Sequence, residues 1–167
     1  YSGDAGRMYI KGFDTFILSL EHLKAKGIQF KAYLLGRTNS EVDYILRKHQ
    51  LEDEVRILGY VPRDKLAAYY RGADVFVCSS RYEADNTAAV EALACGTPVV
   101  GTDVPGIEKT LSFRREDPRD LADKLGEISE SKEYYQSEVK NQASQWSIKQ
   151  VIHKWEQVYR EVIKNGI

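Results

Sequence analysis

A short apolar run in the middle of the chain, Asp74–Ser80 (DVFVCSS), constrains the fold more than any other feature. Runs of this kind are typical of strands that are buried on both faces of a parallel sheet. Helical signals flank it, in Arg63–Arg71, which Gly72 ends, and in Asn86–Ala94, and a further strand is expected at Pro98–Gly101. Because strands alternate with helices over short links, we predict an α/β fold whose parallel sheet carries helices on both faces.

The same alternation extends towards the N-terminus. Additional elements are expected as strands at Tyr1–Asp4, Gln29–Gly36 and Val55–Gly59, and as helices at Phe13–Leu23 and from Asn39 or Ser40 to about His49. From Pro118 onward the chain is predicted to be helical, and its last helix, Ser147–Asn165, has an apolar stripe. We therefore predict one domain, with a Rossmann-like α/β core at residues 1–117 and a helical tail at residues 118–167.

Composition narrows the class of protein. A length of 167 residues suits a single domain with a substantial core. The net charge of −1 argues against a general nucleic-acid binder, which should be clearly basic. Cys78 and Cys95 have apolar neighbours and no metal-ligand spacing, so both are expected to be buried, reduced thiols. No apolar run approaches the length of a membrane span, and a start at Tyr1 suggests a piece of a longer protein.

In open parallel sheets, ligands bind beyond the carboxyl ends of the strands, near the N-termini of helices. The loops that follow the expected strands are therefore the places to look for a site. They are Asp4–Lys11, Gly36–Ser40, Gly59–Arg63, Ser79–Asn86 and Gly101–Glu108.

Two carboxylates flank one expected helix start, with Glu83 on an open loop and Glu91 within the helix. The start itself should present free amides at Asn86, Thr87 and Ala88, together with the positive end of the helix dipole, and such an end suits a diphosphate. Carboxylates on either side could then hold paired hydroxyls. The alternative is that both glutamates are ordinary solvated charges, since two other Glu pairs in the chain share this spacing.

The stretch from Ser79 to Ile107 (SSRYEADNTAAVEALACGTPVVGTDVPGI) resembles the signature of retaining glycosyltransferases of the GT-B architecture, family four in particular. Gly6–Asp14 (GRMYIKGFD) is similar to the Gly-Arg … Lys-Gly-x-Asp motif of that family. Val55–Val61 and Leu66–Ser80 resemble two further family segments, in the same order. The resemblance implies that the chain is the C-terminal, donor-binding half of a GT-B enzyme.

The resemblance also implies roles for individual residues. Arg7 and Lys11 match the basic pair that neutralises the donor diphosphate. Glu83 matches the glutamate that contacts hydroxyls of the donor sugar, and Glu91 matches the one that binds the ribose diol. Arg7, Lys11 and Glu83 are accordingly the expected catalytic residues.

The remaining expected positions bind the donor. Asn86 and Thr87 would offer backbone amides to the phosphate or the sugar. Tyr60 and Val61 follow the strand where the nucleobase of the family rests, and Gly106 matches a glycine turn near the sugar. Ala84-Asp85 replaces the usual Gly-Phe after Glu83, so the resemblance does not identify the sugar.

No Asp-x-Asp occurs in the sequence, so we expect no metal and no cofactor. The resemblance implies transfer of a hexose, with retention of configuration, from a UDP-, GDP- or ADP-linked sugar to a glycan or lipid acceptor, as in polysaccharide biosynthesis. The partner of this domain would be an N-terminal acceptor domain that the sequence lacks, and the isolated domain should be inactive. The expected location is the cytoplasm, where the full-length enzyme could also contact the inner face of the membrane peripherally.

Two other classes of function remain open. One is a related GT-B enzyme, either a sugar-nucleotide epimerase or a phosphorylase, and the basic pair together with the glutamate pair favours a transferase over both. The other is a non-catalytic regulatory module on the same fold, which should have no affinity for nucleotides.

Overall fold

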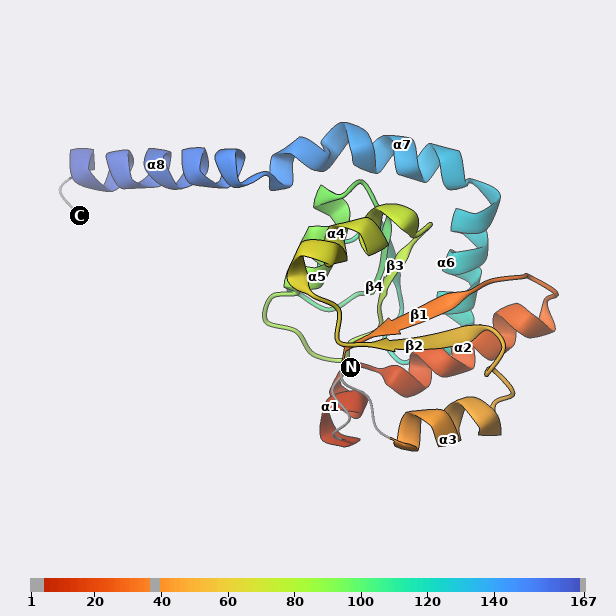
Figure 1. Cartoon of the computed structure of the whole chain (residues 1–167). Helices are drawn as coiled ribbons and strands as arrows, with labels where there is room; N and C mark the ends of the chain where they lie inside the picture. Colours follow the sequence, from red (N-terminus) through yellow and green to blue (C-terminus); the bar gives the residue numbers. More distant parts are fainter. Residues whose placement is uncertain (1–4, 37–39, 166–167) are drawn as a thin grey trace.

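The computed structural model describes residues 5–36 and 40–165, which form an α/β core followed by a helical tail (Figure 1). The strands are β1 (Ala32–Leu35), β2 (Val55–Gly59), β3 (Phe76–Cys78), β4 (Val99–Thr102) and β5 (Leu111–Phe113). The helices of the core are α1 (Ala5–Ile10), α2 (Phe13–Ala25), α3 (Ser40–Lys48), α4 (Arg63–Gly72) and α5 (Thr87–Ala94). The tail comprises α6 (Pro118–Glu130), α7 (Lys132–Gln142), the 3-10 helix η1 (Ala143–Trp146) and α8 (Ile148–Asn165).

All strand pairings in the described residues are parallel, as predicted, and they form two groups. β1 pairs with β2, and β3, β4 and β5 pair in that order. Successive β4 residues point to opposite faces: Val99 packs in the cluster around α5, and Val100 packs in the cluster around α2 and α6. Both valines are fully buried, so this strand is covered on both sides by helices.

Helix α2 forms the centre of the larger core. Phe13, Ile17 and Leu20 recur at helical spacing and are buried, and α2 packs against the buried face of α6, which carries Leu121 and Ile128. Pro118 stands in the first turn of α6, where its missing N–H is not needed, and the preceding Asp117 accepts hydrogen bonds from two first-turn amides. The tail is thus anchored to the α/β core through α6.

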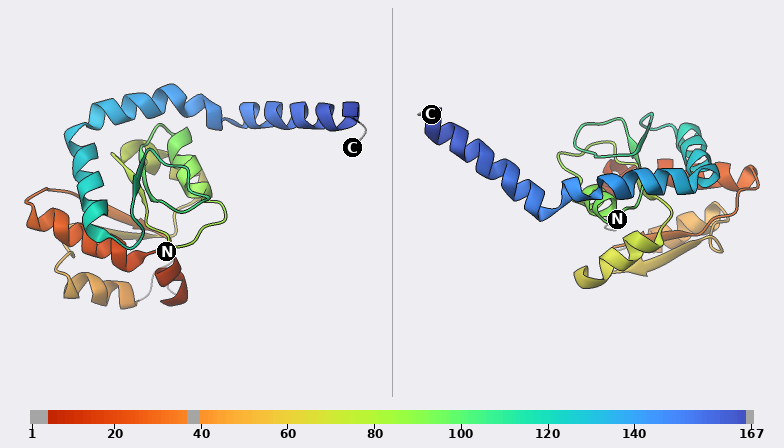
Figure 2. Two further views of the ribbon diagram at one scale, coloured as in Figure 1. Left: turned by 180° about the vertical axis from the view of Figure 1, so that it is seen from behind. Right: turned by 90° about the horizontal axis from the view of Figure 1, so that it is seen from above.

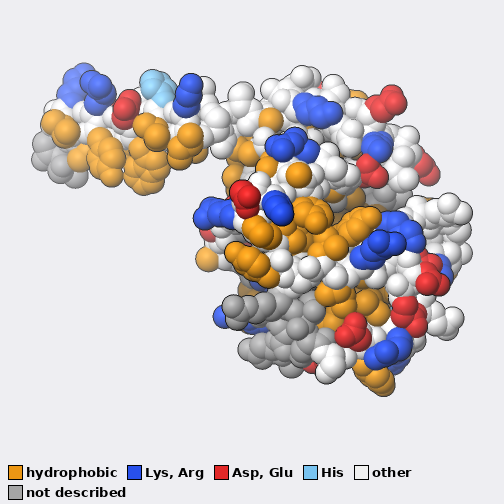
Figure 3. Space-filling model, in the orientation of Figure 1, with side chains coloured by type: hydrophobic (Ala, Val, Ile, Leu, Met, Phe, Trp, Pro, Cys, Tyr) orange, Lys and Arg blue, Asp and Glu red, His pale blue; other side chains and the backbone are white. Residues whose placement is uncertain are grey.

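Helix α8 leaves the core and projects away from it (Figures 1 and 2). Its predicted apolar stripe exists, and Figure 3 shows it along one side of the helix, where Val151, Trp155, Val158, Tyr159 and Val162 are all exposed. No helix in the described part of the chain has the length and apolar character that crossing a bilayer requires.

Several expectations need correction. Residues 5–10 of the predicted loop Asp4–Lys11 form helix α1, because its backbone carbonyls find amide partners one turn on. Strand β5 was not predicted, because a strand of only three residues leaves almost no periodic pattern in the sequence. Cys78 is buried as expected, but Cys95 is partly exposed because it lies at the C-terminal end of α5. The predicted strand end at Tyr1–Asp4 and the alternative cap at Asn39 lie outside the described residues.

Candidate functional site

Asn86 organises the start of α5. Its side-chain oxygen accepts from the amide of Ala89 at 3.0 Å, which caps the helix, and its own amide donates to the carbonyl of Gly106 at 2.8 Å. The prediction of a free amide at Asn86 is therefore wrong. The amides of Thr87 and Ala88 stand in the first turn and donate to no other group among the described residues, as predicted.

Glu83 is enclosed rather than solvated, and its side chain is only 10% exposed. One carboxylate oxygen, Oε1, accepts from Ser80 Oγ at 2.9 Å and from Asn86 Nδ2 at 2.9 Å, and it forms an ion pair with Lys11 Nζ. The open-loop position expected for this residue is wrong, because three donors converge on its carboxylate. The structure thus joins two of the predicted catalytic residues that stand 72 positions apart in the sequence.

Lys11 reaches Glu83 because the turn after α1 lies directly on the end of β3. Ser79 Oγ donates to the carbonyl of Lys11 at 2.9 Å, and the amide of Arg81 donates to the carbonyl of Ile10 at 2.8 Å. Gly12 has a φ of 60°, and a Cβ there would stand 1.9 Å from the carbonyl oxygen of Ser79. Only glycine allows this close approach, so the Lys-Gly pair positions the lysine.

Arg7 lies one helical turn before Lys11, whose amide donates to the Arg7 carbonyl at 2.9 Å. Its side chain is exposed, and it forms no ion pair among the described residues. The predicted basic pair is therefore divided between a lysine bound to Glu83 and an arginine directed to solvent.

Glu91 occupies the second turn of α5 and remains accessible, with 35% of its side chain exposed. Its Oε2 accepts from the hydroxyl of Tyr70 at 3.1 Å, and Oε1 lies 3.8 Å from Nη2 of Arg63. Burial, together with the charge of Glu91, raises the pKa of Tyr70 well above its usual value, so the phenol stays a donor. Tyr70 and Arg63 were not predicted as site residues.

The remaining predicted positions follow the carboxyl ends of β2 and β4 along the chain. Gly106 has a φ of 79°, and a Cβ there would meet the carbonyl oxygen of Ala84 at 2.5 Å, so this turn packs closely on the loop that carries Glu83. Tyr60 is exposed and Val61 is partly buried in the link between β2 and α4. This link ends at Arg63, the residue that approaches Glu91.

A third residue that the sequence analysis missed is Arg81, whose side chain is 6% exposed. It binds Asp14 through two nitrogens, at 2.8 and 2.7 Å, and its Nε donates to Glu116 at 2.6 Å. The hydrogen bond from Arg81 lowers the pKa of the Asp14 carboxyl, and these contacts raise that of the guanidinium. Asp14 belongs to the quoted motif, but nothing in the sequence connects it to Arg81.

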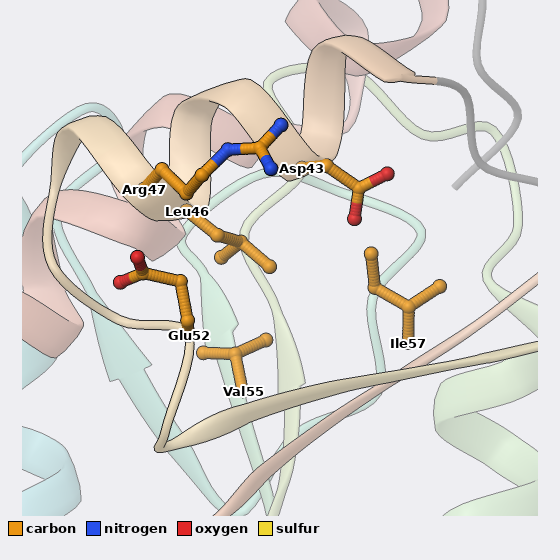
Figure 4. Close-up of a pocket in the computed structure, with 6 residues that line it drawn as sticks. All are labelled: Asp43, Leu46, Arg47, Glu52, Val55 and Ile57. Carbon is orange, nitrogen blue, oxygen red and sulfur yellow. The ribbon is translucent and has the colours of Figure 1, made fainter.

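Two cavities lie outside this site. One, of about 240 Å³, lies between α3 and β2 (Figure 4) and is lined by Asp43, Leu46, Arg47, Glu52, Val55 and Ile57. The other, of about 320 Å³, is lined by residues of α1, α2 and α3 and by His49. Neither cavity includes a predicted site residue. Within the described residues, no cluster of His, Cys, Asp or Glu side chains has the arrangement of a metal site.

Comparison with known sequences identifies a family. The pattern of the family described as glycosyl transferases group 1 matches residues 3–131. Mannosylfructose-phosphate synthase of Agrobacterium fabrum is 46% identical over 77 residues, which cover 44% of this chain and 17% of that protein. D-inositol 3-phosphate glycosyltransferase of Pseudarthrobacter chlorophenolicus is 34% identical over 118 residues, which cover 66% and 28%.

Comparison with solved structures agrees on the fold. Sucrose-phosphate synthase from Thermosynechococcus elongatus superposes with a TM-score of 0.75 and 24% identity, over 90% of this chain and 43% of that one. HepE of Anabaena, solved in complex with UDP-glucose, has a TM-score of 0.76 and 21% identity, over 93% and 46%. The chain therefore spans less than half the length of these relatives and structural neighbours.

Proposed function

Because this chain belongs to the glycosyl transferases group 1 family and has the fold of the C-terminal domain of GT-B glycosyltransferases, we propose that it binds the nucleotide-sugar donor of such an enzyme. The enzyme would transfer a hexose, with retention of configuration and without a metal, to a glycan or lipid acceptor, in the cytoplasm or at the inner face of its membrane. The observation that carries the proposal is the Lys11–Glu83 ion pair beside the capped start of α5, with Glu91 one turn further on.

The chemistry follows from what this arrangement offers a departing nucleoside diphosphate. Negative charge builds on the diphosphate as the glycosidic bond breaks, and groups aimed in advance at that charge lower the barrier. Lys11 supplies a cation, Arg7 supplies a second one from one turn away, and the amides of Thr87 and Ala88 at the helix start donate to no other group among the described residues. These groups could stabilise the leaving phosphate without a metal.

The two glutamates would hold the parts of the donor on either side of the diphosphate. Glu83 would accept hydroxyls of the sugar through the carboxylate oxygen that is not occupied by Lys11, Ser80 and Asn86. Glu91, which is partly exposed, would accept the ribose diol. We assign no covalent nucleophile to the reaction.

The acceptor would bind to a second domain. The curated relatives are several times longer than their matched segments, which supports a partner domain beyond this chain. We therefore expect the chain alone to bind donor and to transfer no sugar. A radiolabelled donor assay in which this chain alone glycosylated a carbohydrate or lipid acceptor efficiently would contradict that expectation.

A thermal-shift screen tests the donor assignment. The panel comprises UDP, GDP and ADP, their glucose and mannose derivatives, and the free nucleosides. A ligand at about one hundred times its dissociation constant should stabilise the chain by about 2.7 kcal/mol. The screen is repeated with Glu91→Gln. Glu138→Gln, on the exposed part of α7, is its matched control because it makes the same change away from the site.

The screen also separates the alternatives. A non-catalytic module predicts no shift with any nucleotide, and that result would overturn the proposed function. An epimerase would convert the nucleotide sugar without an acceptor, so chromatography of the recovered ligand distinguishes it from a transferase.

A further inference from the structure

Arg81 connects three segments that meet at the candidate site. It stands two residues before Glu83, and its nearly buried guanidinium reaches the α1–α2 region and the loop after β5. The hydrogen bonds go to Asp14, Glu116 and the carbonyl of Tyr9, the last at 2.6 Å. No other described residue forms ion pairs with two carboxylates from different segments in this way.

The contacts account for a buried arginine. Removing a charge from water is unfavourable unless opposite charges and hydrogen bonds replace the lost hydration. Asp14 offers a two-pronged carboxylate that matches the planar fork of the guanidinium, Glu116 binds Nε, and the Tyr9 ring lies 4.2 Å from Cζ. The geometry depends on the fork, which a lysine cannot reproduce.

The residues that Arg81 holds lie on both sides of Lys11. Tyr9 is two positions before the lysine and Asp14 is three positions after it, while the Arg81 amide binds the carbonyl of Ile10. Because Arg81 is also two residues from Glu83, one residue contacts both of the segments that carry the ion pair.

The third segment, the loop between β5 and α6, contains a residue with an unfavourable backbone conformation that its contacts must stabilise. Glu116 has a φ of 62°, a conformation that non-glycine residues rarely adopt. Its carboxylate binds Nε of Arg81 at 2.6 Å. Arg81 therefore connects the β5–α6 loop to the turn between α1 and α2 that carries Lys11.

We propose that Arg81 is a positioning residue that holds the Lys11 cation against Glu83, so that the diphosphate and sugar parts of a donor meet a preformed arrangement. The inference rests on the proposed function for its ligand but not for its geometry. It differs from an ordinary structural ion pair in one consequence: loss of Arg81 should affect the phosphate contact far more than the rest of the fold or the nucleoside contact.

The test compares Arg81→Met and Arg81→Lys with the wild-type chain, and with Arg71→Met, which alters an exposed arginine at the end of α4. Calorimetry measures the affinity for UDP, GDP and ADP and for the three nucleosides. Hydrogen exchange without ligand follows residues 9–12 and 79–86, with residues 16–25 of α2 and with β4 as references for the global fold.

We expect Arg81→Met to lower diphosphate affinity by about tenfold or more, and nucleoside affinity by less than about threefold. Exchange should quicken by about tenfold or more at residues 9–12 and 79–86 and remain unchanged in residues 16–25 of α2 and in β4. Arg81→Lys, which keeps the charge and loses the fork, should fall between the wild type and Arg81→Met, and Arg71→Met should match the wild type.

Unchanged exchange in both segments would overturn the proposal, as would equal acceleration throughout the chain or equal losses for nucleosides and diphosphates. If the wild-type chain bound no nucleotide, the proposed function would fail. The exchange measurement needs no ligand, so it would still decide whether Arg81 positions Lys11 and Glu83.

Discussion

Glu83 and Glu91 flank the same helix start, yet they lie in opposite surroundings. Glu83 is enclosed, and its Oε1 accepts from three donors, whereas Glu91 has one hydroxyl donor at 3.1 Å and a distant, mostly exposed arginine. The carboxylate of Glu83 is thus an enclosed part of the hydrogen-bond network around the site, while that of Glu91 has few contacts and is partly exposed. Mutation of Glu83 should therefore change both stability and ligand binding, whereas mutation of Glu91 should change mainly ligand binding.

The largest difference is expected in stability. Glu83→Ala should lower the free energy of unfolding by about 2–4 kcal/mol, because Ser80 and Asn86 are buried and lose their shared acceptor. Glu91→Ala should cost less than about 1 kcal/mol, since its partners can turn to water. Urea titrations of both variants measure the two values, and comparable losses would abolish the distinction between an enclosed and an open carboxylate.

The next effect concerns the cation bound to Glu83. Lys11→Met should weaken nucleoside diphosphate binding by about 1.5–3 kcal/mol while leaving nucleoside binding nearly unchanged, because a charge-assisted contact is lost. Arg7→Met should have a smaller effect, since the Arg7 side chain is exposed and unpaired among the described residues. Calorimetry with each diphosphate and its nucleoside provides the comparison. Equal weakening of both ligands by Lys11→Met would remove the lysine from the phosphate site.

A smaller effect should separate the two glutamates by ligand. Glu91→Gln should weaken every ribonucleotide by about 1 kcal/mol and narrow the preference for ribose over 2′-deoxyribose, because the carboxylate is what demands the diol. Glu83→Gln should weaken the nucleotide sugar and spare the nucleoside diphosphate. Titrations with a nucleoside diphosphate, its deoxy analogue and the corresponding nucleotide sugar examine this division. Identical profiles for the two variants would show that the roles are not divided.

The smallest effect concerns the donor to Glu91. Tyr70→Phe removes the hydroxyl bound to Oε2 and should lower the free energy of unfolding by about 0.5–1 kcal/mol near neutral pH. The pKa of Tyr70 is raised in the folded chain, so its contribution is fully present below the unfolded pKa near 10 and is lost as pH rises through the folded pKa. Stability curves above pH 10 should therefore fall less steeply for Tyr70→Phe than for the wild type, and parallel curves would count against this contact.

The α/β alternation could be predicted from the sequence because it depends on local signals. The run at Asp74–Ser80 contains β3, and the helix expected at Asn86–Ala94 is α5, with Asn86 as its cap. Short elements without a strong period could not be predicted: α1 is six residues long and β5 is three. Their conformation depends on the surfaces against which they pack.

The candidate site divides in the same way. Lys11, Glu83 and Glu91 could be predicted as site residues because they lie in continuous stretches that resemble the motifs of the family. No local pattern identifies Arg81 or Tyr70, since their partners lie 67 and 21 positions away in the chain. Long-range pairs of this kind become visible only when the folded chain brings them together.

By itself, the sequence determined most of the segments that become strands and helices and which residue types surround the start of α5, because periodicity and capping act over a few positions. Only the tertiary structure decided that Glu83 is enclosed and Glu91 accessible. That outcome depends on Lys11, which lies in the turn after α1 and forms an ion pair with Glu83. In this turn Gly12 allows the chain to approach Ser79 closely, and Arg81 holds the turn in place. The burial of a charge is a property of everything that packs around it, so it cannot be read from the neighbours of that charge along the chain.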